Sequence, residues 1–447
     1  MPRVDAEPVQ YNGGRKLRNN NESAIASMPA VYTSTPPLMR FATIAAGIAI
    51  FVAPFQRSAG LRGTMWVLAG LAILFTYWRA GKLEHLIPPY RALGIAALAW
   101  LMAATIWSFA SPTPLESLGA VKRDILTPML AFAVFYALTK TRADMMRWLW
   151  ALTLGLLVLT IMIVIEPFDP LGGMQESHYI TVGMLSAWIV MLAPLLALSL
   201  FANRRSRRSA RVLLIVALPC LLLSAWLSGN RAVWVCFAGM LVVATLMATR
   251  GRLAALGHRR SSAVALVLLA LMLSFMIAAM QFRARTQAPN GLGPLAFMLQ
   301  DNRAPILRVT ADMIAERPLL GYGYANAEIG AAFSARLESP WLKNYVRHAH
   351  NVVLDYALQM GLTGAIVILG LFAALAWTFT TRIPLGGLAR LAGLCGVALV
   401  VGVFLRNMTD DFFSRHSAQF FGAAVGMLLG LATHRPPLSL QRSPERK

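Results

Sequence analysis

The sequence predicts an all-α membrane protein that crosses the bilayer about twelve times. Of its 447 residues, 57% are hydrophobic and only 13% are charged, and the mean hydropathy is +0.59. This is too little charge to cover a soluble core of that size. A membrane-spanning helix needs ~20 apolar residues, so about twelve spans account for the hydrophobic residues. The composition excludes a soluble enzyme, a disordered chain and a disulfide scaffold.

Apolar runs mark the expected spans in chain order. They cover residues 41–56, 62–78, 92–110, 122–139, 146–166, 178–202, 211–228, 230–250, 262–282, 350–379, 388–406 and 416–433. The first run lacks the short apolar region and cleavage pattern of a signal peptide, so we expect it to remain as a span. No internal repeat or linker is evident. We expect a cytoplasmic tail (1–39), nine spans (40–282), a long outer loop (283–349), three spans (350–433) and a second cytoplasmic tail (434–447).

The basic residues predict the orientation of the chain. The formal net charge is +22, a value that often indicates nucleic-acid binding. Here, however, Lys and Arg concentrate in alternate loops, as they do in the cytoplasmic loops of membrane proteins. If both termini are cytoplasmic, every basic cluster lies on the cytoplasmic side. We therefore expect membrane lipids, and no nucleic acid, as partners.

The loop 283–349 is the one sizeable segment expected on the outer face. It contains a predicted helix over 303–316 and the turn PLLGYG at 318–323, and it ends near His348 and His350. Long loops with structure of their own are usually functional. We therefore expect the chemistry at the outer face, which is the periplasm in a Gram-negative cell.

The catalytic machinery typical of soluble enzymes is absent from the sequence. It has no GxxxxGK phosphate loop, no Asp-x-Asp pair, no HExxH motif and no Cys/His cluster. The cysteines Cys220, Cys236 and Cys395 lie in apolar runs without ligand spacing, so we interpret them as core-packing thiols. No metal or cofactor is expected, and an enzyme at the outer face would need a membrane-borne donor.

The segment Arg347-His348-Ala349-His350-Asn351, just before the tenth expected span, is the best local pattern for chemistry. The positive end of a helix dipole disfavours imidazolium, so we expect His350 to be mostly neutral and able to accept a proton. Asn351 is expected to orient His350 or to hold a substrate hydroxyl. The alternative is that both histidines only cap a helix at the water interface.

Cationic side chains on the outer side indicate an anionic ligand. Arg231 lies between the seventh and eighth spans, and Arg303 opens the loop helix. Guanidinium groups bind phosphate and diphosphate oxygens in pairs of hydrogen bonds. Arg308, Lys122 and Arg123 are weaker candidates, because a solvated helix face or contact with lipid headgroups explains them equally well.

Acidic residues and glycines complete the set of candidates. Asp410 and Asp411, between the last two spans, would pair with the arginines or orient an acceptor sugar. Asp355, one turn after His350, is either functional or a structural hydrogen-bond partner. Gly361 and Gly364 are one turn apart and are expected to let another helix approach closely.

Two motifs together resemble a known family. His350-Asn351, followed after nine residues by Gly361-x-x-Gly364, resembles the His-[Asn/Ser/Gln]-x9-Gly-x-x-[Gly/Thr/Tyr] signature of bacterial O-antigen ligases. Arg303 followed by the turn 318–323 resembles the loop of the wider O-antigen ligase and polymerase superfamily. Leu307 departs from the aromatic residue that many relatives carry. These motifs lie within residues 225–365, while the likeness in architecture covers the whole chain.

The resemblance implies a C-type glycosyltransferase-like enzyme of the bacterial inner membrane. It implies transfer of a polysaccharide from undecaprenyl diphosphate to a sugar of lipid A–core, without metal or nucleotide. By position, it implies that His350 is the catalytic base and that Arg231 and Arg303 hold the diphosphate. The expected substrate-binding residues are Arg308, His348, Asn351, Arg123, Lys122, Asp410 and Asp411.

Other functions remain open at this stage. An O-antigen or exopolysaccharide polymerase uses the same donor, and a protein O-oligosaccharyltransferase often carries a further C-terminal periplasmic domain. A secondary transporter, from a different class, usually has repeated halves and broken helices. Neither repeated halves nor broken helices are evident in the sequence.

Overall fold

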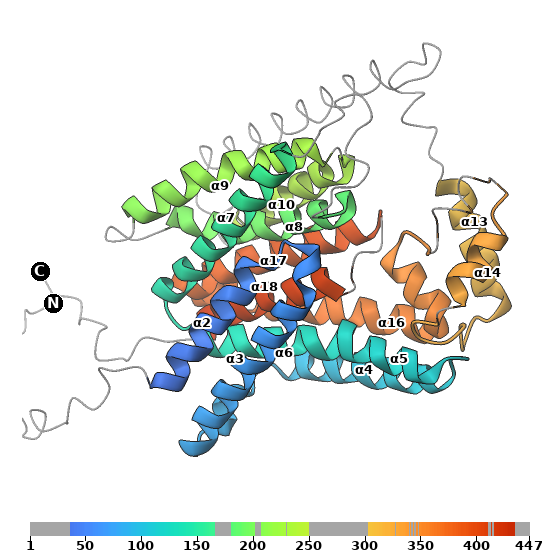
Figure 1. The fold of residues 1–447 in the computed structure, drawn as a ribbon, viewed down its shortest axis with the longest axis horizontal. Coiled ribbons are helices and arrows are strands. Elements are labelled where there is room, and N and C mark those ends of the chain that lie inside the picture. Colours follow the sequence, from blue (N-terminus) through green and yellow to red (C-terminus); the bar gives the residue numbers. More distant parts are fainter. Residues whose placement is uncertain are drawn as a thin grey trace, which may run out of the picture. The chain divides into compact units, whose positions relative to one another are not determined.

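The structure is a computed structural model. It describes residues 36–165, 180–201, 207–228, 230–249, 303–326, 328–338, 340, 343, 346, 348–409, 413 and 415–433. These residues form helices and turns, and no β-strand occurs among them, so the all-α prediction is confirmed for this part of the chain (Figure 1). The chain divides into a unit of residues 1–37 and a compact unit of residues 38–447.

The main helices follow the predicted spans. They are α2 (Pro37–Phe51), α3 (Ala59–Arg79), α4 (Arg91–Phe109), α5 (Pro114–Val121), the π-helical η3 (Lys122–Leu126), α6 (Thr127–Leu138), α7 (Arg142–Ile165), α8 (Val182–Ala197), α9 (Arg207–Leu227), α10 (Arg231–Thr249), α16 (Val352–Thr380), α17 (Gly387–Asn407) and α18 (Arg415–Thr433). Each predicted span overlaps one of these helices, except the ninth, 262–282, which lies outside the described residues.

Several helices have the length and composition of membrane spans. Among the described residues, six helical segments meet both criteria: Gln56–Arg79, Arg91–Phe109, Arg142–Ile165, Arg208–Leu227, Val352–Leu385 and Gly387–Asn407. Shorter apolar helices cover Pro37–Phe51, Gly183–Ala197 and Ala232–Ala248. The protein therefore has the character of a multi-pass membrane protein, while the count of about twelve spans stays a prediction.

Small residues bring α6 and α18 into backbone contact. A Cβ atom added at Gly422 or Gly426 of α18 would lie 2.3 Å from the carbonyl oxygen of Pro128 or Phe132, respectively. At Gly430 it would lie 2.7 Å from the carbonyl oxygen of Thr139. Glycine at every fourth position is the device by which membrane helices approach most closely. Most residues of α18 are also buried, so this helix lies inside the bundle.

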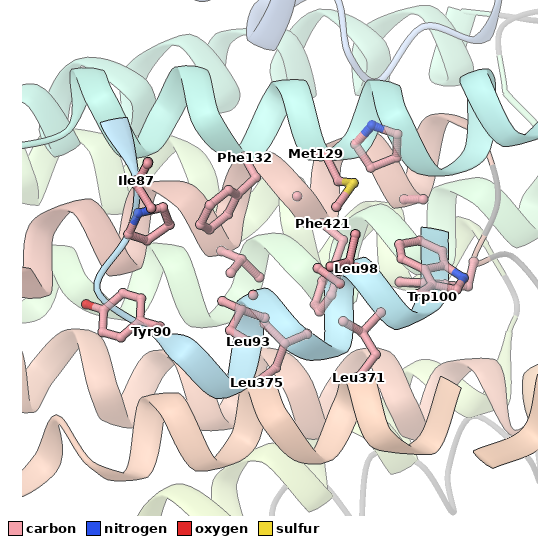
Figure 2. A pocket seen from close by; sticks show the side chains of 18 residues that line it. Ile87, Tyr90, Leu93, Leu98, Trp100, Met129, Phe132, Leu371, Leu375 and Phe421 are labelled. Carbon is pink, nitrogen blue, oxygen red and sulfur yellow. The ribbon is translucent and has the colours of Figure 1, made fainter. Parts of the chain in front are cut away.

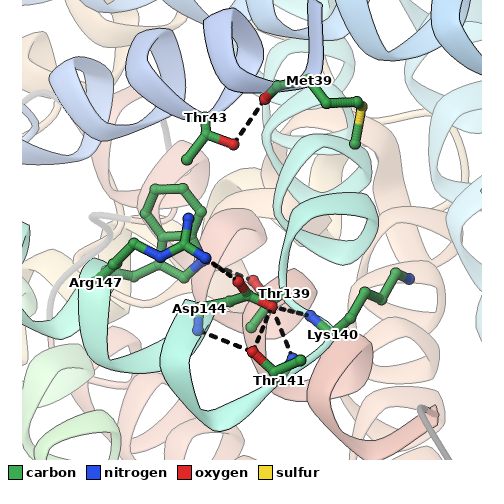
Figure 3. Close-up of polar contacts among 8 residues, drawn as sticks. Met39, Thr43, Thr139, Lys140, Thr141, Asp144 and Arg147 are labelled. Carbon is green, nitrogen blue, oxygen red and sulfur yellow. Dashed lines mark hydrogen bonds and ion pairs between the residues drawn. The ribbon is translucent and has the colours of Figure 1, made fainter. Parts of the chain in front are cut away.

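A capped turn joins α6 to α7 (Figure 3). The carboxylate of Asp144 accepts hydrogen bonds from the backbone N–H groups of Lys140 (3.1 Å) and Thr141 (2.8 Å). The Thr141 hydroxyl in turn accepts from the backbone N–H of Asp144 at 3.2 Å. These reciprocal bonds satisfy donors at the start of α7. Trp148 Nε1 also donates to the Thr139 hydroxyl at 2.9 Å, so the turn that carries Lys140 is held on both sides.

The helix predicted over 303–316 is confirmed as α13 (Arg303–Glu316). It packs with α14 (Ile329–Ala335) around a hydrophobic cluster separate from that of the bundle. The buried members of this cluster are Ile306, Met313, Phe333, Leu337, Val346 and Leu358. Because Leu358 belongs to α16, the cluster fixes the loop helices to the helix that follows the histidines.

Candidate active site

Asn351 is the residue that starts α16. Its side-chain oxygen accepts hydrogen bonds from the backbone N–H groups of Val353 (3.0 Å) and Leu354 (3.1 Å), as expected of a helix N-cap. Its Nδ2 donates to the carbonyl of Met408 at 3.3 Å, just past the end of α17. Asn351 therefore has a structural role at the junction of α16 and α17.

His348 and His350 lie next to each other immediately before this cap. Their ring centroids are 4.2 Å apart, and the backbone N–H of His350 donates to Nδ1 of His348 at 3.3 Å. His350 has φ +51°, a left-handed conformation that costs a non-glycine residue about 1–2 kcal/mol. Strained residues of this kind cluster at functional sites. Both rings are partly exposed, so they are accessible at this end of the bundle.

The turn at 318–323 docks directly onto α16, which is broken at this point. Met360 and Gly361 leave the helical conformation, with φ +65° at Gly361. The backbone N–H groups of Tyr322 and Gly323 donate to the carbonyls of Leu358 (3.0 Å) and Gln359 (2.9 Å). These are carbonyls that the break leaves without a helical partner. The turn therefore replaces part of the helix's own hydrogen bonding.

The glycines of the signature serve this contact, and the expectation that they admit another helix is wrong. A Cβ at Gly361 would lie 2.3 Å from the carbonyl oxygen of Leu319, so its close neighbour is the turn. A Cβ at Gly364 would lie 2.2 Å from the carbonyl oxygen of Tyr356, on the other side of the break in the same helix. The sequence expectation that no span is broken is also wrong for α16.

Asp355 and Gln359 connect the histidine segment to the turn. Asp355, 6% exposed, accepts a hydrogen bond from Gln359 Nε2, and the backbone N–H of Ala349 lies 3.5 Å from its Oδ1. The side-chain oxygen of Gln359 accepts from the backbone N–H of Ala325 at 2.8 Å. Of the two roles considered for Asp355, these contacts support that of a structural partner.

The turn is also held from the side of α4. Trp107 Nε1 donates to the carbonyl of Leu320 at 2.7 Å, and the backbone N–H of Tyr324 donates to the carbonyl of Trp107 at 3.2 Å. Gly323, with φ +96°, lies so close to Ser111 that a Cβ would fall 2.7 Å from its Cα. The PLLGYG turn is therefore held between the ends of two helices.

An ion pair at the end of α13 fixes the far side of the same turn. Arg336 pairs with Glu316, one of its guanidinium bonds measuring 2.9 Å, and the hydroxyl of Tyr322 donates to Glu316 at 2.6 Å. These hydrogen bonds lower the pKa of Glu316 to about 2. Arg317 lies over the Tyr322 ring, 4.6 Å from its centroid.

The buried Arg406 connects the ends of three further helices. This side chain is 1% exposed, and its Nε donates to the hydroxyl of Ser186 in α8 at 2.9 Å. Asn230, which precedes α10, donates from Nδ2 to the same hydroxyl at 3.3 Å. Arg406 also lies 3.4 Å from the Thr409 hydroxyl and from the carbonyl of Gly183. Sequence reasoning missed Arg406 as a site residue, although an arginine at the edge of an apolar run is a signal of function.

The two arginines expected to hold a diphosphate each begin a helix. Arg231 is the first residue of α10 and Arg303 is the first residue of α13. Asn230 ties the start of α10 to Ser186, and Asn351 ties the start of α16 to the end of α17. The fold thus links the Arg231 segment to the histidine segment through α17.

The weaker candidates are dispersed. Arg308 is exposed on α13, and Lys122 is exposed on η3. Arg123 forms a two-bond pair with Asp124, both bonds measuring 3.1 Å, and Asp124 also accepts from the backbone N–H of Arg415 at 2.9 Å. Arg123 therefore takes part in a local structural contact. Asp410 and Asp411 lie outside the described residues.

The cysteines and the potential metal ligands were the other candidates for chemistry. Cys220, Cys236 and Cys395 are buried free thiols, in agreement with the packing role predicted for them. Among the residues that the structure describes, no group of three or more His, Cys, Asp or Glu side chains is arranged to hold a metal ion.

The fold and this site define a helical, multi-pass membrane protein with a hydrogen-bonded polar site at one end of its bundle. Residues 216–369, roughly a third of the chain, match the family model described as O-antigen ligase. The resemblance to the O-antigen ligase superfamily is thereby confirmed, and the matched segment holds both proposed diphosphate arginines, the PLLGYG turn and the histidine–glycine signature. No curated protein matches the chain at a significant level.

Proposed function

We propose that the protein is an O-antigen ligase, which transfers O-antigen polysaccharide from undecaprenyl diphosphate to a sugar hydroxyl of lipid A–core. The observation that carries this proposal is the docking of the 318–323 turn onto the break in α16, nine residues after His350-Asn351. Both motifs lie inside the segment that matches the O-antigen ligase family. Members of that superfamily are glycosyltransferase-like enzymes that act on lipid-linked polysaccharides.

In the proposed reaction, His350 is the general base. Its ring lies at the accessible end of α16, and its strained backbone is fixed by the cap that follows it. It takes the proton from an acceptor hydroxyl as that oxygen forms a bond to the anomeric carbon of the donor sugar. His348, whose Nδ1 accepts from the backbone of His350, holds the segment in this conformation.

Arg231 and Arg303 are the proposed partners of the leaving group. As the new glycosidic bond forms, the bond between the anomeric carbon and the diphosphate oxygen breaks, and its electron pair goes to the diphosphate. Two guanidinium groups suit that developing charge. Attack from the face opposite the departing diphosphate inverts the anomeric configuration. The reaction needs no metal and no nucleotide.

The proposed location is the bacterial inner membrane with the site facing the periplasm. The basic loops support this orientation, because they all fall on the side opposite the histidines in the predicted topology. The donor and the acceptor are both amphiphiles of that membrane, so each reaches the site from the bilayer.

The test is the lipopolysaccharide profile of a deletion strain complemented with wild type, His350→Ala or His85→Ala. Undecaprenyl-linked polymer is measured in the same cells. We expect wild type and His85→Ala to restore long polymer on lipid A–core. His85 is an exposed histidine on η2 (Leu83–Leu86), far in sequence from the site, and serves as the matched control. His350→Ala should leave the polymer on the lipid carrier.

The other functions predict different profiles. If single repeat units still reach lipid A–core while long chains vanish, the protein is a polymerase. An unchanged profile in the deletion strain would rule out both activities. Full ligation by His350→Ala at normal expression would remove His350 as the base while leaving the family assignment intact.

A further inference from the structure

An apolar groove lies between α4, α6, α16 and α18 (Figure 2). None of the proposed catalytic residues lines it. Its volume is about 310 Å³, and hydrocarbon side chains line nearly all of it. Apolar cavities do not retain water and accept apolar guests. A cavity of this size is within the range of ligand pockets in proteins.

The groove is open along one side, and its long axis runs from Tyr90 to Trp100. Ile87 and Leu98 line it and are 72% and 57% exposed, so it opens along α4, which has the character of a membrane span. Figure 2 shows Tyr90 and Trp100 at opposite ends. Ten residues of helix separate them, which is about 15 Å. This is half the ~30 Å hydrocarbon core, the depth that one acyl chain reaches from one membrane surface.

Aromatic side chains close the end nearer to the candidate site. Trp100 is 4% exposed, and its Nε1 donates to the hydroxyl of Tyr356 at 3.0 Å. Phe413 packs against Trp100 with ring centroids 5.8 Å apart, and it is also buried. Trp100 therefore closes this end of the groove against Tyr356 of α16. A lipid in the groove therefore has its headgroup at the Tyr90 end.

Two cations flank the Tyr90 end. The guanidinium of Arg382, just beyond the end of α16, lies 4.8 Å from the centroid of the Tyr90 ring. The Lys140 ammonium lies 4.4 Å from the centroid of the Tyr136 ring, which stacks on the groove-lining Phe132 at 5.8 Å. In the predicted topology both cations face the cytoplasm, where the membrane leaflet is anionic.

We propose that this groove binds one acyl chain of an anionic phospholipid, whose phosphate is held by Lys140 and Arg382 at the cytoplasmic surface. Basic pockets between membrane helices on that side are known to suit anionic headgroups. Asp144 fixes the backbone of the turn that carries Lys140 (Figure 3). The Lys140 ammonium itself donates to the carbonyl of Tyr136 at 2.8 Å, so the cation is positioned before the lipid arrives. Burial lowers the pKa of Lys140 to about 8, and a neighbouring phosphate would favour its charged form. The site is independent of the proposed ligase activity.

The acyl-chain part is tested by filling the groove. Gly94 lines the groove, and a Cβ there would have no atom within 4 Å, so Gly94→Leu projects into it without a clash. Gly370 of α16 is equally unobstructed but does not line the groove, and Gly370→Leu is the matched control. Delipidated protein in mild detergent is titrated with phosphatidylglycerol and examined by native mass spectrometry. We expect saturable binding of one molecule in the wild type and the control, and its loss in Gly94→Leu.

The headgroup part is tested with charge variants. Lys140→Gln and Arg382→Gln should each weaken phosphatidylglycerol binding by about fivefold, the factor that corresponds to about 1 kcal/mol per cation at a membrane surface. Lys82→Gln, an exposed lysine outside the groove, should leave it unchanged. Phosphatidylcholine should bind more weakly than phosphatidylglycerol, and inorganic phosphate should not compete at equal concentration.

Four results would overturn the proposal. Unchanged binding in Gly94→Leu would place the lipid elsewhere. Equal affinity for phosphatidylcholine would remove the role of charge, and competition by inorganic phosphate would indicate an ion site without an acyl chain. Displacement of the lipid by a polyprenyl diphosphate would assign the groove to the donor of the proposed reaction. If Gly94→Leu loses the far-ultraviolet circular dichroism of a folded helical protein, Gly94→Val is used in its place, because it fills part of the same space.

Discussion

Gly361 and Gly94 occupy opposite kinds of environment in the same bundle. Gly361 has φ +65°, and a Cβ there would lie 2.3 Å from the carbonyl oxygen of Leu319. Gly94 has ordinary helical geometry and no atom within 4 Å of an added Cβ. At Gly361 a side chain is excluded because two backbones touch, whereas at Gly94 the missing side chain leaves open space. Whether a glycine can be replaced is therefore decided by the atoms around it and not by the helix that contains it.

The regions around these glycines are held by different forces. Around Gly361, backbone and side-chain hydrogen bonds join the histidine segment, the 318–323 turn and the end of α4. Around Gly94, aliphatic and aromatic side chains form a groove that opens along α4. Hydrogen-bonded geometry fails when one partner is removed, because the other is left unsatisfied. An apolar wall that borders open space tolerates small changes in volume more readily.

The largest effect is expected for Gly361→Val. A β-branched residue at a left-handed φ is strained, and its side chain would collide with Leu319, so the turn must leave α16. We expect loss of transfer by more than tenfold, together with faster tryptic cleavage at the exposed Arg317. Gly370→Val, at an open position of the same helix, is the control. Wild-type activity in Gly361→Val would show that the docked turn is not needed.

Arg406→Ala should come next. It removes the buried guanidinium that donates to Ser186, and a hydrogen bond from a charged group contributes about 1.5–3 kcal/mol. If Arg406 positions the Arg231 segment, the apparent KM for lipid-linked donor should rise more than kcat falls, and Arg406→Lys should restore part of the affinity. A fall in thermal stability with unchanged KM would mean that the role is structural only.

Gln359→Ala is expected to have an intermediate effect. The backbone N–H of Ala325 loses its acceptor and Asp355 loses a donor, so the unfolding free energy should fall by about 1–3 kcal/mol. Hydrogen exchange should accelerate at residues 320–326 in particular. Thr64→Ala, which removes an exposed hydroxyl bond within α3, is the comparison variant. Equal exchange in both variants would contradict the proposed connection.

Gly94→Ala should change stability in the opposite direction. The methyl group meets no neighbour, and alanine favours a helix over glycine by roughly 0.5–1 kcal/mol. A small increase in the unfolding temperature is therefore expected, whereas Gly361→Ala should lower it. Destabilisation by Gly94→Ala would mean that the groove has no room for a methyl group at this position.

The smallest effect is a pH dependence at Glu316. Its pKa is about 2 in the fold, because Arg336 and Tyr322 bond to it, and about 4.3 in an unfolded chain. The pair therefore stabilises the fold fully above about pH 4.3, and this contribution is lost as the pH falls through about 2. The difference in unfolding temperature between wild type and Glu316→Gln should be constant near neutral pH and shrink in acid. A constant difference at all pH values would show that ionised Glu316 does not stabilise the fold through this pair.

Some elements were predictable because their signal is local. The loop helix over 303–316 follows from a short run of helix-forming residues, and its ends coincide with those of α13. The apolar runs predict most helices for the same reason. The break at Gly361 was missed because a glycine inside an apolar run has the same local pattern whether its helix is continuous or broken. The pairing of Arg406 with Ser186 was missed because these residues are distant in sequence.

The sequence by itself determined the membrane character, the positions of the basic clusters and the residues that resemble the O-antigen ligase signature. Each depends on composition, or on spacings within one segment, which a linear chain displays directly. Only the tertiary structure decided that the PLLGYG turn bonds to the open carbonyls of α16, that Asn351 joins α16 to α17, and that a groove separates α4 from α18. These features arise because residues far apart in the chain satisfy one another's hydrogen bonds or leave space between them, and neither result is encoded in any single segment.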